Sequence, residues 1–112
     1  MQTSERVVMA YIKAMDEHRY DAAEELLDQN IKIYGPAGEG FGGPKGFISM
    51  MRKFPGRYDL KKMFVDRDDV CLLYDFGMEG KSVYMSSWYK VRNGKIEFIR
   101  TIFDPRAFDD PA

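Results

Sequence analysis

Hydrophobic residues return every three or four positions in the first part of the chain. Over residues 4–18 this spacing predicts an amphipathic helix with one buried face. Asp21, followed three residues later by Glu24, forms a capping-box pattern that predicts a second, shorter helix over residues 21–27. Residues 30–34 then alternate between apolar and polar side chains, which predicts a half-buried strand.

The rest of the chain predicts one more helix and then only strands. Residues 35–43 are rich in glycine and predict a loop, and Pro44 begins a helix that ends before Phe54. Glycine in Glu79-Gly80 and Asn93-Gly94 supplies the positive φ of tight hairpin turns, so the last three strands form an antiparallel meander. The predicted strands, all rich in β-branched and aromatic residues, are 58–65, 70–78, 83–91 and 96–103.

This order predicts an α+β fold in a single domain over residues 1–108, followed by a polar tail over residues 109–112. The helices come before the main run of strands, so they can cover only one face of a sheet. We therefore expect a curved, mostly antiparallel sheet that wraps around the helices, in the order helix, helix, strand, helix and four strands.

Composition narrows the range of partners. The chain has 112 residues, 45% of them hydrophobic, and a formal net charge of -1, which is typical of a globular protein. Its charged stretches are short and mixed in sign, so we predict no nucleic-acid partner. No run of apolar residues is long enough to span a membrane. The N-terminus lacks the basic residues followed by an apolar stretch that form a signal peptide. We therefore predict no membrane association and a cytoplasmic location.

Metal and cofactor sites have little support in the sequence. His18 is the only histidine and Cys71 the only cysteine, which excludes a histidine-rich zinc or iron site and an intrachain disulfide. The sequence does not exclude a magnesium site made of carboxylates alone. The loop over residues 35–43 lacks the Gly-Lys-Ser/Thr signature of phosphate-binding loops, so no nucleotide is expected there. We predict no metal and no cofactor.

The register of the last hairpin decides which side chains share a face. A two-residue turn at Asn93-Gly94 pairs Arg92 with Lys95, whereas a three-residue turn with a glycine bulge pairs Val91 with Lys95. We expect the three-residue turn, because it puts glycine at the left-handed bulge position. One face then carries an apolar wall with few polar groups, which suits either a hydrophobic ligand site or an ordinary core. Its residues are Leu72, Tyr74, Phe76, Val83, Met85, Ser87, Ile99, Thr101 and Phe103.

Two groups of residues are candidates for chemistry. Amphipathic aromatic side chains offer hydroxyl or indole donors inside an apolar cavity, or simply pack in the core. Asp104 and Arg100 lie four positions apart, on one face of the last strand, where the arginine would lower the pKa of the acid. The alternative is that Asp104 only caps the turn at Pro105. The aromatic candidates are Tyr11, Tyr34, Tyr74 and Trp88.

Short motifs lie at five places along this order: Val-Val-Met-Ala-Tyr (7–11), Tyr-Gly-Pro (34–36), Phe-Gly-Gly-Pro-Lys-Gly-Phe-Ile (41–48), Asn-Gly-Lys-Ile (93–96) and Phe-Asp-Pro (103–105). In these motifs and in the order of its elements, the chain resembles the nuclear transport factor 2-like superfamily. It resembles most of all the SnoaL-like polyketide cyclase and ketosteroid isomerase-like branches. The resemblance implies a cone-shaped sheet closed by helices, a pocket at one end of the cone, and a homodimer that pairs through the outer face of the sheet.

The resemblance also implies roles for single residues. Tyr11 matches the oxyanion-donating tyrosine of ketosteroid isomerases. The position of their carboxylate base falls at Tyr34 or Gly35, and that of their second carboxyl at Ser87 or Trp88, so isomerisation by that mechanism is not predicted. Asp104 matches the acid/base residue of SnoaL-like cyclases.

Three functional hypotheses follow. In the first, the cone binds a small apolar or aromatic molecule, and Tyr11 with Tyr34 or Ser87 hydrogen-bonds its polar end. In the second, the chain is a cyclase or isomerase in which Asp104 is the general acid/base and Tyr11 stabilises an oxyanion. In the third, the domain is an interaction module that pairs through its outer sheet face. The expected ligand-binding residues are Tyr11, Tyr34, Tyr74, Phe76, Met85, Ser87, Thr101 and Phe103.

Overall fold

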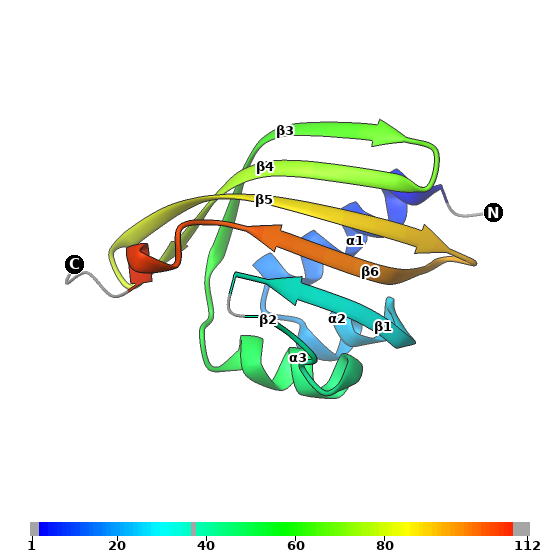
Figure 1. Cartoon of the computed structure of the whole chain (residues 1–112), viewed down its shortest axis with the longest axis horizontal. Helices are drawn as coiled ribbons and strands as arrows, with labels where there is room; N and C mark the ends of the chain where they lie inside the picture. Colours follow the sequence, from blue (N-terminus) through cyan, green and yellow to red (C-terminus); the bar gives the residue numbers. More distant parts are fainter. Residues whose placement is uncertain (1–2, 37, 109–112) are drawn as a thin grey trace.

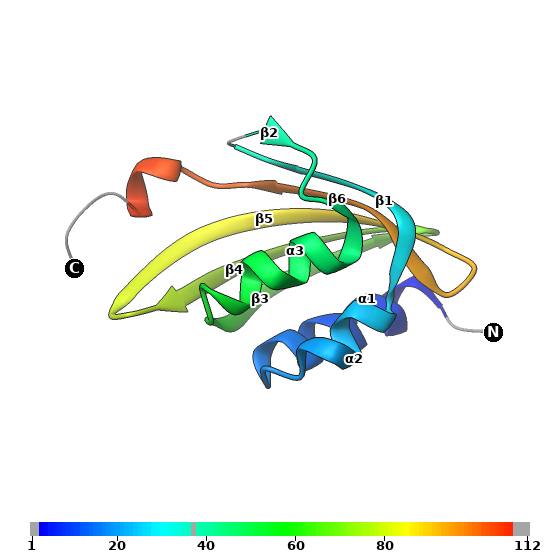
Figure 2. The same ribbon diagram turned by 90° about the horizontal axis from the view of Figure 1, so that it is seen from below.

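A strongly curved sheet forms one layer of the molecule, and the helices lie against its concave side (Figures 1 and 2). This computed structural model describes residues 3–36 and 38–108; the polar tail predicted over residues 109–112 lies outside them. The elements are α1 (Ser4–Asp16), α2 (Tyr20–Glu25), β1 (Leu27–Gly35), β2 (Gly38–Glu39), α3 (Gly43–Arg52), β3 (Arg57–Asp66), β4 (Asp69–Met78), β5 (Lys81–Arg92), β6 (Lys95–Ile102) and the 3-10 helix η1 (Pro105–Phe108).

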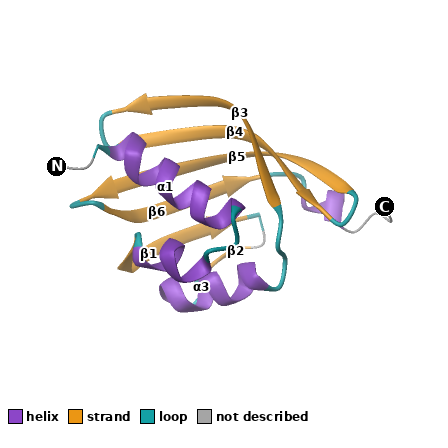
Figure 3. Cartoon of the chain, turned by 180° about the vertical axis from the view of Figure 1, so that it is seen from behind, coloured by secondary structure: helices purple, strands orange, loops and turns teal. Residues whose placement is uncertain are grey.

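The strands form one unclosed sheet in the order β2-β1-β6-β5-β4-β3. Only β1 and β6 run parallel, and every other neighbouring pair is antiparallel. Seen from behind, the helices cross in front of the sheet and cover its inner face (Figure 3). The predicted α+β class and the curved, mostly antiparallel sheet around the helices are confirmed. None of the helices in the described residues is long and apolar enough to cross a membrane.

The first helix begins at Ser4 as predicted but ends two residues earlier, and the second helix differs from the prediction at both ends. Thr3 caps α1 and accepts a hydrogen bond of 3.3 Å from the backbone N–H of Arg6. The helix stops at Asp16, because the chain turns there and His18 adopts a left-handed φ of 58°. The capping box at Asp21 is wrong, since α2 begins one residue earlier and has no side-chain cap. Asp21 instead pairs with Arg52 of α3, at 2.7 Å.

The region around β1 also holds more strand than predicted. β1 begins at Leu27, which pairs with Ile96 of the parallel neighbour β6. Inside the predicted loop, Gly38 and Glu39 form β2 and pair with the end of β1. The longer β1 comes from pairing with the distant strand β6, which local composition does not encode, whereas β2 pairs with residues only a few positions before it.

The expected three-residue turn between β5 and β6 is wrong. Arg92 pairs with Lys95, and Asn93 and Gly94 have φ values of 52° and 76°, as a two-residue turn requires. The extra residue lies within β6 instead: Val91 pairs with Ile96 but Lys90 pairs with Phe98, which leaves Glu97 as a bulge.

A bulge inside the strand changes the face of later residues as a longer turn would. The set of side chains predicted to share the inner face is therefore correct, although the individual pairs differ. Ser87 lies opposite Thr101 on β6 and opposite Leu72 on β4. Together with the buried face of α1, these strands enclose the hydrophobic core.

Asp16 joins the end of α1 to the start of β3. Its Oδ1 accepts hydrogen bonds from Arg57 Nε at 3.0 Å and from the backbone N–H of Tyr58 at 2.8 Å. The hydrogen bond from Arg57 lowers the pKa of this carboxyl, more than its partial burial raises it. The ionised carboxylate therefore stabilises the fold.

We expect Asp16→Asn to lower the free energy of unfolding by about 1–2 kcal/mol at neutral pH, as loss of a hydrogen-bonded charge does. Because the folded-state pKa lies below the unfolded value of about 3.9, this stabilisation is complete above that value and disappears as the pH falls through the folded pKa. Urea unfolding of both proteins at neutral and acidic pH measures it.

Asp21→Asn is the matched control, because Asp21 is 94% exposed in its pair with Arg52 and should contribute little. A loss for Asp16→Asn that stayed constant down to about pH 2, below the folded pKa of most carboxyls, would contradict a role for the charge.

Candidate functional site

Three hydroxyl groups form a continuous hydrogen-bonded row across the concave face. Tyr74 Oη of β4 lies 2.8 Å from Ser87 Oγ of β5, and Ser87 Oγ lies 2.9 Å from Thr101 Oγ1 of β6. Tyr74 and Ser87 are buried, whereas Thr101 is half-buried. This hydroxyl row, as we call Tyr74, Ser87 and Thr101, therefore leads from the core toward solvent.

Further tyrosines surround the inner end of the hydroxyl row. Tyr11 of α1 packs edge-on against Tyr89 of β5, with ring centroids 6.0 Å apart. The ring of Tyr58 of β3 lies 5.2 Å from that of Tyr74. The register explains the gathering, because Tyr89 follows Ser87 by two positions on the same face and Tyr58 pairs with inward-facing Phe76.

Burial keeps these phenols protonated. It raises the pKa of Tyr74 to about 12, against a smaller opposite effect of the hydrogen bond with Ser87. Burial raises the pKa values of Tyr11, Tyr58 and Tyr89 well above their usual range, and neighbouring phenols add to the effect. At neutral pH the cluster is therefore a set of uncharged hydrogen-bond donors and acceptors.

Apolar side chains line the end of the concave face where β4 turns into β5. We call this the hairpin end, and it is defined by Met78, Phe103, Ala107 and Phe108, all partly exposed and packed on the core. Phe103 and Phe108 meet edge to face at 5.3 Å. Lys81 Nζ of the hairpin reaches the carbonyl oxygens of Ala107 and Phe108 at 3.5 and 3.3 Å, which holds η1 beside it (Figure 1).

The structure brings most of the expected ligand-binding residues together. Tyr11, Tyr74, Phe76, Met85 and Ser87 are buried on the inner side, and Thr101 and Phe103 are half-buried there. Of the half-buried members, Phe103 belongs to the hairpin end and Thr101 lies two positions before it.

Tyr34 does not belong to this group, and the expectation that it faces the cone is wrong. Ile31 and Ile33 of β1 are buried, so the alternation turns Tyr34 to the outer face. There it pairs with Arg100 of β6, whose guanidinium lies 4.7 Å from the centre of the Tyr34 ring.

Trp88 is also on the outer face. Its indole Nε1 donates to Asp69 Oδ1 at 2.8 Å, and Lys90 Nζ lies 4.9 Å from the centre of its ring. It therefore offers no donor to the concave face.

Asp104 and Arg100 do not face each other, which corrects the predicted acid and its partner. Asp104 lies beyond the end of β6, and its side chain is 54% exposed and bonded to Arg106 at 2.9 Å. Hydrogen bonds from Arg106 lower the pKa of Asp104. Its Oδ1 also accepts from the backbone N–H of Arg106, at 3.0 Å, so Asp104 caps η1. The direction of the pKa shift is opposite to what a general acid at neutral pH needs.

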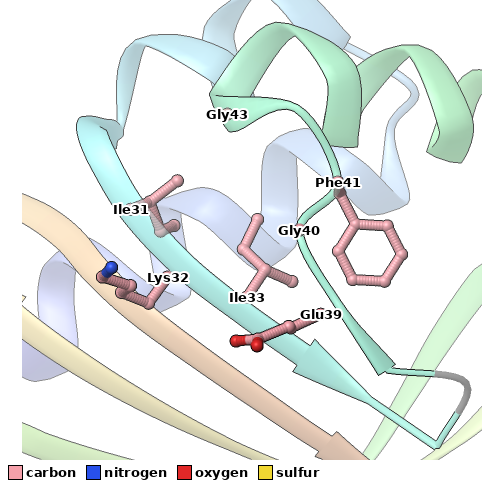
Figure 4. Close-up of a pocket in the computed structure, with 7 residues that line it drawn as sticks. All are labelled: Ile31, Lys32, Ile33, Glu39, Gly40, Phe41 and Gly43. Atoms are coloured by element: carbon pink, nitrogen blue, oxygen red, sulfur yellow. The ribbon is translucent and has the colours of Figure 1, made fainter.

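Two hollows in the described residues lie away from the hydroxyl row. One, of about 190 Å³, separates β1 from the glycine-rich segment before α3 (Figure 4) and is lined by Ile31, Lys32, Ile33, Glu39, Gly40, Phe41 and Gly43. The other, of about 530 Å³, is a shallow polar surface feature lined by Glu24, Glu25, Leu27, Asp28, Gln29, Asn30 and Lys95. Neither includes a residue of the hydroxyl row or one of the tyrosines packed around it.

The chemistry of the concave face is hydrogen bonding without charge. Across residues 3–36 and 38–108, no charged side chain is buried, and Ser4 and Ser87 are the buried polar residues other than tyrosine. Such a face can hold and orient a polar atom of a ligand but supplies no group that titrates near neutral pH. Tyr58 and Tyr89 were missed at the sequence level, although the alternation that selected Ser87 also points to Tyr89.

Comparisons with known proteins place this geometry in context. The model of the SnoaL-like domain family matches residues 8–99. An NTF2-like protein of unknown function from Cytophaga hutchinsonii has a TM-score of 0.91 at 32% identity, over 98% of this chain and 97% of that one. The curated proteins give no match.

Two more distant structures share the fold. A candidate SnoaL-like polyketide cyclase from Shewanella denitrificans has a TM-score of 0.82 at 14% identity, over 96% of this chain and 94% of that one. An LEH-like epoxide hydrolase from M. tuberculosis has a TM-score of 0.80 at 16% identity, over 90% and 82%. At these identities the likeness concerns the fold alone.

Proposed function

The chain belongs to the SnoaL-like domain family of the NTF2-like superfamily, and from this premise we propose that it binds a small apolar or aromatic molecule at the hairpin end of its concave face. The observation that carries the proposal is the hydroxyl row, which sets three hydrogen-bonding groups in an otherwise apolar wall. A few placed polar groups among apolar side chains are typical of small-molecule sites.

Binding accounts for the site better than acid/base catalysis by Asp104. The concave phenols are protonated at neutral pH, as an exposed phenol is, and burial raises their pKa values further. Asp104 lies outside the concave face with a lowered pKa and an arginine partner. We therefore expect Asp104→Asn to leave ligand affinity unchanged, whereas a cyclase or isomerase that uses Asp104 as its general acid/base would lose turnover in this variant.

The test uses adjacent residues on opposite faces of β6. Thr101→Phe puts a ring into the space proposed for the ligand, whereas Ile102→Phe puts the same ring on the outer face, where Ile102 is 64% exposed. With acetonaphthone as the probe, we expect Thr101→Phe to weaken binding at least about tenfold, as steric exclusion costs more than 1.4 kcal/mol. Ile102→Phe should bind like the wild type.

Binding is measured by calorimetric or fluorescence titration, after unfolding curves have established that both variants are folded. Wild-type protein that shows no saturable binding of acetonaphthone, or equal weakening in both variants, would contradict the proposal.

A second candidate function, self-association, is favoured by the outer face of the sheet. Large apolar side chains are exposed across adjacent strands: Phe64 (53%), Tyr84 (58%), Trp88 (38%) and Ile102 (64%). β5 and β6 are neighbours in the sheet, and β4 joins β5 to β3, because Trp88 pairs with Cys71, which pairs with Phe64. Contiguous apolar surface of this kind is typical of interfaces. We propose that a second copy covers it and forms a homodimer.

A further inference from the structure

The number of hydrogens in the hydroxyl row limits what it can bind. Each hydroxyl has one hydrogen to donate and two lone pairs that accept. The three hydroxyls of Tyr74, Ser87 and Thr101 are joined by two hydrogen bonds. Two of the three hydrogens are used within the row, and one remains for another partner.

Burial decides which hydrogen remains. If the row ran from Thr101 to Tyr74, the spare hydrogen would belong to Tyr74, which is 4% exposed and whose hydroxyl has Ser87 as its hydrogen-bond partner in the described residues. An unpaired buried O–H group is costly. A phenol is also a better donor than an aliphatic hydroxyl, because its pKa is far lower. Both effects make Tyr74 donate to Ser87.

Ser87 then donates to Thr101. Ser87 is 1% exposed, and if Thr101 donated to it, its own hydrogen would be left unpaired in the core, which is costly. Ser87 therefore accepts from Tyr74 and directs its own hydrogen to Thr101 Oγ1, at 2.9 Å. The spare hydrogen of the row therefore belongs to Thr101, and donation along the row strengthens it.

Thr101 presents this hydrogen where a ligand can reach it. Thr101 is half-buried and lies two positions before Phe103, on the apolar hairpin end. No charged side chain is buried in the described residues, and the Lys81 ammonium at this end is bonded to carbonyl oxygens of Ala107 and Phe108. An ionised ligand would lose its hydration without gaining a buried counter-charge.

We propose that the site selects uncharged compounds that carry a hydrogen-bond acceptor, such as a ketone or ester carbonyl, and that Thr101 is the residue that donates to it. This inference rests on the proposed function, since it names the class of ligand for the same site. It specifies the direction in which hydrogens are donated along the hydroxyl row. It also names a single donor to the ligand, at the outer end of the row.

Three probes of similar shape separate the contributions. Acetonaphthone carries an uncharged carbonyl, ethylnaphthalene replaces that carbonyl by a methylene group, and naphthoate is ionised at neutral pH. We expect acetonaphthone to bind wild-type protein about fivefold more tightly than ethylnaphthalene, the effect of one hydrogen bond. Naphthoate should bind at least about tenfold more weakly than acetonaphthone, because its carboxylate loses hydration while the Lys81 ammonium at this end is already bonded to the carbonyl oxygens of Ala107 and Phe108.

Thr101→Val removes the hydroxyl and keeps the shape of the side chain. In this variant acetonaphthone should lose its advantage over ethylnaphthalene, while ethylnaphthalene binds as it does to the wild type. Thr101→Ser should restore the advantage. Ser86→Ala is the control, because Ser86 lies on the outer face and contacts Cys71.

The outcomes separate this inference from the proposed function. If none of the probes binds, ligand binding at the concave face is itself wrong. If ethylnaphthalene and acetonaphthone bind but Thr101→Val leaves their ratio unchanged, the assignment of Thr101 as donor is overturned. Naphthoate binding as tightly as acetonaphthone would overturn the selection for uncharged ligands.

Discussion

Gly46→Ala is expected to lower the free energy of unfolding by about 2 kcal/mol, the reverse of the usual gain of up to about 1 kcal/mol when alanine replaces glycine within a helix. Gly46 lies in the first turns of α3. A Cβ atom there would lie 2.0 Å from the backbone oxygen of Phe41 and 3.0 Å from its carbonyl carbon. Backbone atoms cannot rotate away, so the helix and the preceding segment would have to separate.

The matched control for this change is Ser49→Ala, at an exposed position of the same helix. It should change the free energy of unfolding by less than about 0.5 kcal/mol, as surface substitutions usually do. Urea unfolding measures both variants. Gly46→Ala that is as stable as the wild type would show that the close approach of α3 to Phe41 is not tight in solution.

The double substitution Tyr84→Lys with Ile102→Lys is expected to abolish the self-association that we propose for the outer face. Both residues are more than half exposed on the outer face, at 58% and 64%. In a face-to-face dimer the four added ammonium groups would be buried without partners, which should weaken self-association on the order of a hundredfold. Sedimentation velocity at several concentrations measures the change.

Phe54→Lys provides the control for this experiment. Phe54 is 51% exposed but lies between α3 and β3, outside the sheet, so this variant should remain a dimer. Wild-type protein that is monomeric at every concentration, or a control variant that dissociates equally, would rule out pairing through the outer face.

Local patterns in the sequence were sufficient for most elements of the fold. The three- and four-residue spacing over residues 4–18 corresponds to α1, and Pro44 lies in the first turn of α3. Glu79 and Gly80 have φ values of 51° and 79° and form the predicted two-residue turn. These features depend on neighbouring residues, so they can be read without knowledge of the tertiary structure.

Features that depend on distant pairing were predicted less well. The bulge at Glu97 arises from the fit between β5 and β6, and no local residue type marks it. Its effect on the inner face was nevertheless predicted, because a bulge and a longer turn shift the alternation equally.

The candidate site was predicted in part, for reasons that differ among its residues. The positions of Ser87 and Thr101 were predicted correctly, because strand alternation placed both side chains on the inner face. Alternation at Ile31 and Ile33 also contained the information that Tyr34 faces outward, but the matched family position pointed inward. Asp104 is held by Arg106 of η1, a short 3-10 helix that hydrophobic periodicity does not reveal.

The most direct test of ligand binding at the concave face is a methyl NMR titration of wild-type protein with acetonaphthone. Met85 and Thr101 carry methyl groups on the inner face, and Ile102 carries them on the outer face. Saturable shifts at Met85 and Thr101, with Ile102 unchanged, are the predicted result. Shifts confined to Ile102, or none at saturating probe, would contradict a ligand site at the hairpin end.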